Sequence, residues 1–304
     1  MIYNWNIIGH EKQLNQLESD ITSGNISHAY LLVGPGHIGK YTVAKKLASI
    51  LQCENNFCGV CPTCIQVRKG SHIDTMEFPN NHESIKIDQV REIISRCNMS
   101  GQSRYKIVML QSLGRMTPEA SNALLKTLEE PPPRTIFIMT TTNIREILPT
   151  ILSRARVMRF HLFSYDFIKD MIKSKYPETD EEKIDQVARL SLGRTGQAID
   201  LMDEQDKFAE SLKLYKDISH LLETPNIVER FSYVEGLLEN EKAMDSFLNI
   251  MTHVLRNRML ESDTAQNNLD TQKLMDMIAS VQEAKVLIGK NVNARLTLEN
   301  LMLY

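Results

Sequence analysis

A glycine-rich segment near the N-terminus has the residue types that bind phosphate. It reads Gly34-Pro35-Gly36-His37-Ile38-Gly39-Lys40, and it lies between the apolar run Ala29–Val33 and a helical pattern over Thr42–Leu51. Glycines between a strand and a helix let backbone N–H groups converge on an anion, to which the helix N-terminus adds partial positive charge. Lys40 stands where a lysine would reach the outer phosphates. The segment therefore predicts weak binding of phosphate, ATP or ADP; a glycine-rich turn without a ligand is the alternative.

The residues that would handle a metal ion and an attacking water are replaced. The Ser or Thr that normally follows the lysine and holds the metal is Tyr41. Thr42 carries a hydroxyl, but one residue later on a helix it points about 100° away. After the apolar run Ile107–Leu110, an ATPase of this type needs Asp-Glu, and the sequence has Gln111 and Ser112. We therefore expect no significant hydrolysis by this chain alone.

Four of the five cysteines fall in one short stretch, as Cys53, Cys58, Cys61 and Cys64. Four thiolates at Cys-x4-Cys-x2-Cys-x2-Cys spacing suit tetrahedral Zn²⁺, and a filled sulfur shell leaves no open catalytic position. The clustering indicates a reducing compartment rather than a disulfide framework. The spacing predicts a structural zinc module over about residues 53–64, with four unligated thiols as the alternative. The fifth cysteine, Cys97, lies in a helical pattern and is predicted to be a buried core thiol.

The composition limits the classes of function. The 304 residues, 42% hydrophobic and 24% charged, suffice for two or three domains with a substantial core. A net charge of −3 argues against a chain that coats nucleic acid by itself. No apolar run approaches the roughly 20 residues of a membrane span, and Met1–Asn6 lacks the basic head and apolar stretch of a secretion signal. We expect a cytoplasmic protein without a membrane partner.

Two kinds of periodicity predict the elements that position these groups. Up to residue 163, apolar strand-like runs alternate with helical patterns, which favours an α/β domain with a parallel sheet. Further strands are predicted at Asp74–Phe78, Ile107–Leu110, Thr135–Thr140 and Val157–Phe160. Further helices are predicted at Ile87–Cys97 and from Thr117 to Pro131, and a helical turn is predicted at Ile144–Leu152. Thr117 and Pro118 are typical of a helix start.

Strand signals vanish after Ser164. Three short helices are predicted at Ser164–Tyr176, Glu181–Leu192 and Thr195–Asp203, and we assign residues 164–206 to a helical lid. Residues 207–304 are predicted to form an all-helical domain used for assembly. Its helical segments are expected to break at Thr224-Pro225, Glu239-Asn240, Asp263–Asn268 and Gly289–Asn293.

Several motifs together resemble the AAA+ subunits of bacterial clamp loaders, over nearly the whole chain. Leu124-Leu125-Lys126-Thr127-Leu128-Glu129-Glu130-Pro131-Pro132 is similar to their shared signature. Ile151-Leu152-Ser153-Arg154 resembles their Ser-Arg-Cys motif, with Ala155 in place of Cys. The cysteine cluster after the phosphate loop is similar to their zinc module. Further similar stretches are Gly70–Asp74, Ile87–Arg91 and Asn291–Glu299.

The resemblance implies a RecA-like AAA+ domain over residues 1–163, a helical lid and a helical collar that oligomerises. It also implies that Arg154 is an arginine finger, acting in trans on nucleotide bound by a neighbouring subunit. The expected partners are the gamma/tau and delta subunits and, through the complex, a sliding clamp and primed DNA. The second-sensor arginine of the motor subunits, three residues past Gly193, falls on Gly196.

Within the family, loss of the hydrolytic groups with Arg154 retained is expected of a non-hydrolysing subunit of the DNA polymerase III clamp loader. The alternative is an ATP-hydrolysing motor of the gamma/tau kind, using Thr42 or a water-mediated metal site. For Arg154 itself, the alternative is a helix-end arginine paired to a surface carboxylate. A zinc-dependent DNA-binding protein is a third possibility, which the negative net charge disfavours.

Overall fold

The computed structural model describes residues 3–55, 57–78, 84–224, 226–238, 241–262, 268–289 and 292–303. Its chain divides into two compact units, which we describe separately: Met1–Phe163 with Arg194–Gln197, and Ser164–Gly193 with Ala198–Tyr304. The predicted helix breaks at 225, 239–240, 263–267 and 290–291 lie outside the described residues. The three-domain division at residues 163 and 206 stays a prediction.

A five-stranded parallel sheet forms the centre of the first unit, with strand order β2-β3-β4-β1-β5. Each predicted strand is present. The bounds are β1 Ala29–Val33, β2 Thr75–Phe78, β3 Lys106–Leu110, β4 Thr135–Thr141 and β5 Arg156–Arg159. The predicted α/β parallel-sheet class, followed by an all-helical part, is therefore confirmed.

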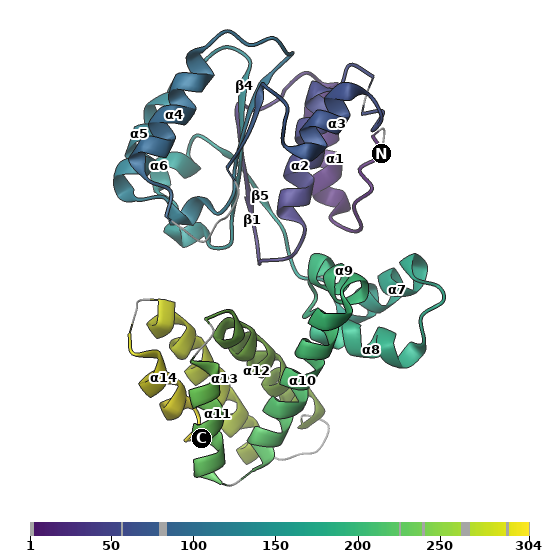
Figure 1. Ribbon diagram of the computed structural model, residues 1–304, viewed down its shortest axis with the longest axis vertical. Coiled ribbons are helices and arrows are strands. Elements are labelled where there is room, and N and C mark those ends of the chain that lie inside the picture. The colour runs from purple at the N-terminus through teal and green to yellow at the C-terminus, as the bar shows by residue number, and fades with distance from the viewer. Residues whose placement is uncertain are drawn as a thin grey trace. The chain divides into compact units, whose positions relative to one another are not determined.

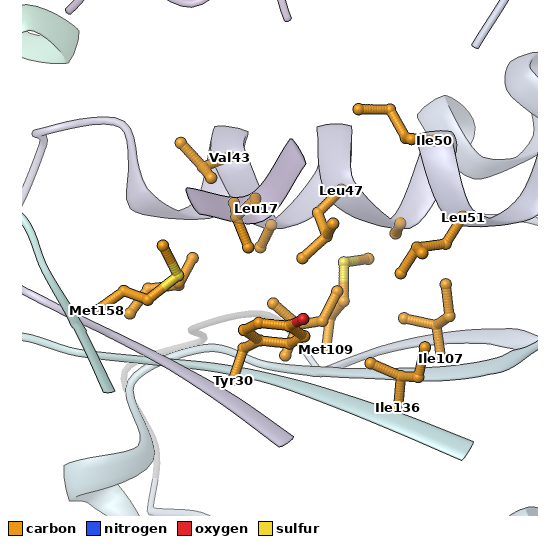
Figure 2. Close-up of a cluster of buried hydrophobic side chains, with 14 of the residues drawn as sticks. Leu17, Tyr30, Val43, Leu47, Ile50, Leu51, Ile107, Met109, Ile136 and Met158 are labelled. Atoms are coloured by element: carbon orange, nitrogen blue, oxygen red, sulfur yellow. The ribbon is translucent and has the colours of Figure 1, made fainter. Parts of the chain in front are cut away.

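Helices cover both faces of this sheet (Figure 1). On one face lie α1 (Glu11–Thr22), α2 (Lys40–Gln52) and α3 (Pro62–Lys69); on the other lie α4 (Ile87–Asn98), α5 (Pro118–Glu129) and α6 (Pro149–Leu152). The side chains of β1 alternate between the two cores. Tyr30 and Leu32 join α1 and α2, and Leu31 joins α4 and α5. Figure 2 shows the first of these cores, where Leu47 of α2 packs over Tyr30.

The helix starts follow local capping chemistry. Thr117 Oγ1 accepts a hydrogen bond from the backbone N–H of Ala120 at 3.2 Å, and Pro118 takes the first helical position of α5. The turn predicted over residues 144–152 is two elements, a 3₁₀ helix η2 (Ile144–Glu146) and α6. A second 3₁₀ helix, η1 (Leu113–Arg115), follows β3. Cys97 is buried as predicted, which raises the pKa of its thiol to about 11.

The second unit consists of helices in its described part. These are α7 Tyr165–Lys175, α8 Glu181–Leu190, α9 Thr195–Asp203, α10 Gln205–Glu223, α11 Ile227–Leu237, α12 Glu241–Ser262, α13 Asn268–Gly289 and α14 Ala294–Leu301, with the start of α9 belonging to the first unit. Apolar residues from α10 to α14 form one core around Phe247 and Leu255. Among the described residues, no helix is long and apolar enough to cross a bilayer.

Candidate functional site

The predicted phosphate loop connects β1 to α2, and the side chain of its lysine is hydrogen-bonded to the backbone of the loop. Lys40 is 7% exposed, and its Nζ donates hydrogen bonds to the backbone oxygens of Gly34 at 2.7 Å and Pro35 at 2.5 Å. A Cβ at Gly34 would lie 2.5 Å from the backbone oxygen of Phe160, so only glycine allows this approach to the strand-end segment. Gly36, His37, Ile38 and Gly39 complete the turn into α2. The chain thus places a lysine and a helix N-terminus together, as a phosphate site requires.

The Tyr41 hydroxyl is hydrogen-bonded to a carboxylate and is therefore not free to bind a metal ion. Its hydroxyl donates to Glu77 Oε2 at 2.8 Å, and Lys45 Nζ lies 3.0 Å from the same oxygen. Burial, together with this bond to Glu77, raises the pKa of the phenol. Thr42 is exposed on α2. Neither hydroxyl is therefore placed as the Ser or Thr of a metal-binding phosphate loop would be.

The end of β3 carries no carboxylate. Gln111 donates its backbone N–H to Phe78 O at 3.1 Å, which continues the sheet by one bond. Ser112 has a left-handed backbone, with φ 59°, and its N–H donates to Thr140 Oγ1 at 3.2 Å. These two positions lack an anionic metal ligand and a general base, because an amide and a hydroxyl supply neither.

One residue beside the loop was missed by sequence reasoning. Arg194 belongs to the short segment that clusters with the first unit; burial, and then the charge of Arg194, lower the pKa of Lys40. Gly196, the position counted as the second-sensor site, has no side chain and packs against the backbone of His37. The arginine stands two residues earlier than the motif count places it. The run Gly193-Arg194-Thr195-Gly196 was the available signal.

The four clustered cysteines converge as their spacing predicts. Their sulfurs all lie within 4.8 Å of one another, with Cys53 Sγ 3.9 Å from both Cys58 Sγ and Cys61 Sγ. A tetrahedral zinc–thiolate centre needs sulfurs about 3.8 Å apart, from a Zn–S bond near 2.3 Å. The set fits a metal ion, which would cross-link the loop to α2 and α3 and supply no open coordination position.

Backbone N–H groups already point at two of these sulfurs. The N–H of Cys61 donates to Cys58 Sγ at 3.3 Å, and that of Cys64 donates to Cys61 Sγ at 3.4 Å, which caps α3. Hydrogen bonds from Val60 and Cys61 lower the pKa of the Cys58 thiol to about 7. The turn therefore favours the thiolate of Cys58, whereas burial raises the pKa of the Cys64 thiol to about 12.

Arg154 follows α6 and is bonded within its own chain. Its Nη2 lies 2.5 Å from Glu129 Oε1 at the end of α5, and its Nη1 donates to Thr150 O at 2.8 Å and Ser153 Oγ at 3.1 Å. None of its bonds among the described residues goes to the phosphate loop. The structure thus brings Arg154 to the end of α5, and not to the chain's own lysine.

Comparison with known proteins identifies the family. A family model described as "DNA polymerase III, delta subunit" matches residues 9–164, a little over half of the chain. The gamma subunit of DNA polymerase III from Buchnera aphidicola of Schizaphis graminum is 29% identical, over 82% of this chain and 71% of that protein. The tau subunit from Escherichia coli K12 is 28% identical, over 77% of this chain and 38% of tau.

A solved structure from Thermotoga maritima, a gamma subunit-related protein of DNA polymerase III, is 23% identical, covers 95% of this chain and 97% of its own, and has a TM-score of 0.49. The chain spans well under half the length of E. coli tau. On the family match, this chain belongs to the DNA polymerase III delta-subunit family and is a subunit of the clamp-loader type.

Proposed function

We propose that this chain is the delta-prime subunit of the DNA polymerase III clamp loader. In this role it does not hydrolyse ATP, supports the complex that loads the sliding clamp on DNA during replication, and supplies Arg154 to a neighbour. The proposal rests on the residue types found at four positions. Tyr41, Gln111 and Ser112 replace the hydrolytic groups, whereas Arg154 is retained.

Hydrolysis of a nucleotide needs a metal held by oxygen ligands and a base or positioning group for water. The Tyr41 hydroxyl is bonded to Glu77, and the end of β3 offers no carboxylate. A chain with this site keeps the means to hold phosphate and lacks the means to cleave it. That combination suits a fixed subunit in a ring whose neighbours do the chemistry.

Arg154 would act on a nucleotide bound by the next subunit. A planar guanidinium can contact two oxygens of the transferring phosphoryl group and stabilise charge in the transition state. Arginine fingers of this kind are worth about 10³–10⁵ in rate. Since the loop of this chain lacks hydrolytic groups, an arginine that serves catalysis has value only in trans.

Other parts of the chain take supporting roles in the proposal. The cysteine cluster holds one structural Zn²⁺, and residues 207–304 form the collar that joins the gamma/tau and delta subunits. The sliding clamp and primed DNA are reached through the complex. Residues 164–206 form the lid.

The second candidate is an ATP-hydrolysing motor subunit of the gamma/tau kind. The names of the curated relatives favour it over the delta-prime assignment, because those relatives are named gamma or tau. The three replaced residues Tyr41, Gln111 and Ser112 argue against a motor subunit. A motor would have to hold its metal through Thr42, which is exposed on α2, or through water.

Phosphate release by the isolated chain, supplied with Mg²⁺ and ATP, separates the two candidates. A delta-prime subunit should release no more phosphate than its Lys40→Ala variant. Turnover on the scale of ordinary ATPases, about 1 s⁻¹ or more, abolished by Lys40→Ala, would contradict the proposal and establish the motor.

A further inference from the structure

Two residues with a left-handed backbone flank Cys58 in the cysteine cluster. They are Phe57, with φ 64°, and Gly59, with φ 74°. This conformation costs a glycine little but strains a bulky aromatic residue. Together the two residues turn the chain so that Cys58 Sγ lies 3.9 Å from Cys53 Sγ. Strain of this kind persists only where the surroundings hold it, and it gathers at ligand sites, so the contacts of Phe57 matter.

The ring of Phe57 is held from two sides. It packs against the buried core between the sheet and α2, and Lys46 Nζ of α2 lies 4.7 Å from the centre of the ring. Cys53 ends α2 seven residues after Lys46, close to two full turns, so both residues lie on the same side of the helix. The geometry therefore places a cation on the turn that carries Cys58, at the end of α2 where the cluster begins.

The charge of Lys46 has no carboxylate to meet. Among the described residues Lys46 forms no ion pair, although its side chain is half-buried. Burial lowers the pKa of Lys46, the charge of Arg68 lowers it further, and a thiolate at Cys64 raises it. Four thiolates around one Zn²⁺ leave two negative charges in excess. A half-buried ammonium and a negatively charged cluster each offset a cost that the other bears alone.

We propose that Lys46 and Phe57 are positioning residues of the metal centre. Phe57 fixes the turn that presents Cys58, and Lys46, seated on its ring, offsets part of the negative charge of the metal-bound cysteines. Residues that contact the ligands of a metal in this way commonly set its affinity by 10- to 100-fold. The inference rests on the zinc site proposed above. It adds two residues to that site that the spacing of the cysteines does not indicate.

Zinc affinity of the full chain, measured by competition with a chromophoric chelator, tests the proposal. Lys46→Met keeps the apolar stem and removes the charge, and it should weaken zinc binding about 10- to 100-fold. Lys46→Arg should restore most of the loss, because a guanidinium keeps the charge and stacks on an aromatic ring. The matched control is Lys183→Met, which removes the cation 5.4 Å from the ring of Phe208 in the second unit. This control should bind zinc as wild type does.

Two further measurements separate a role at the metal from a general loss of stability. Phe57→Leu keeps an apolar side chain without the aromatic face and should also weaken zinc binding. Combined with Lys46→Met, it should weaken binding by less than the product of the two single effects, because the two residues act together. Lys46→Met should lower the unfolding temperature more in the zinc-loaded chain than in the zinc-free chain, whereas a purely structural lysine would lower both equally.

The outcomes distinguish this inference from the zinc site on which it rests. A wild-type chain purified without zinc would overturn both. Zinc bound by the wild type, with unchanged affinity in Lys46→Met or an equal loss in Lys183→Met, would overturn the role of Lys46 and Phe57 and leave the zinc site standing.

Discussion

The guanidinium of Arg154 forms an ion pair with the carboxylate of Glu129, at 2.5 Å between Nη2 and Oε1. The pair joins a residue two positions after the end of α6 to the last residue of α5. Both side chains are partly open to solvent, 32% for Arg154 and 48% for Glu129. Exposed pairs of this kind contribute only about 0–1 kcal/mol. Glu129 therefore orients Arg154, and breaking this pair costs little free energy, as the proposed action of Arg154 on a neighbouring subunit requires.

Replacing Glu129 tests how tightly this pair is held. Glu129→Gln should lower the free energy of unfolding by less than about 1 kcal/mol, because solvent screens the pair. Urea unfolding measures this free energy. The matched control is Glu235→Gln, which breaks a different exposed ion pair, the one between Glu235 and Arg295. A loss of several kcal/mol in Glu129→Gln alone would show that Arg154 is a structural residue.

The cysteine cluster should hold one zinc ion per chain. Cys61→Ser removes one of four ligands, so the purified variant should lose the metal and unfold at a lower temperature. Cys97→Ser, outside the cluster, should keep it. Metal analysis of the wild-type chain that found no zinc, or a disulfide among the four cysteines in reducing buffer, would be incompatible with a metal centre.

Lys40 should make stability depend on pH in the alkaline range. Its pKa is about 8 in the folded chain and 10.5 as the ordinary value. Between these values the unfolded chain binds more protons at this site than the folded chain does. The contribution of this group to stability therefore rises with pH through that window, and below about pH 8 its cost is fully present.

Lys40→Met should abolish that contribution. Relative to the variant, the wild type should be least stable below about pH 8 and should recover as pH rises toward 10.5. The measurement is urea unfolding across this range, with the exposed Lys12→Met as control. Parallel profiles of stability against pH for wild type and Lys40→Met would refute the lowered pKa of Lys40.

Local patterns predicted most of the first unit's elements. Apolar runs place β1, β3 and β4 within one residue at each end, because buried parallel strands need continuous apolar side chains. Thr117 and Pro118 place the start of α5, since capping depends on adjacent residues. The convergence of the cysteines also follows from spacing, because short knuckle turns leave few other arrangements.

Contacts between distant segments were beyond these patterns. Helix α3 (Pro62–Lys69) was not predicted, because it is only eight residues long and its first three residues belong to the cysteine motif. The Arg154–Glu129 pair joins residues 25 positions apart, and Gly196 packs against the backbone of His37 although the two residues lie more than 150 positions apart. Counting residues from Gly193 gave Gly196, and no local pattern predicts the backbone bond from the Gln197 N–H to His37 O that holds this segment at the loop.

The most direct test of the account is the ATPase rate of the reconstituted clamp loader, stimulated by DNA and clamp, with Arg154→Ala in this subunit. The complex should assemble normally, and hydrolysis at the site beside this subunit should fall by about 10³–10⁵, the range for arginine fingers. Arg154→Lys should rescue little, because an ammonium cannot span two phosphate oxygens as a guanidinium does. Arg154→Ala complexes that assemble normally and hydrolyse ATP at the wild-type rate at every site would contradict the account.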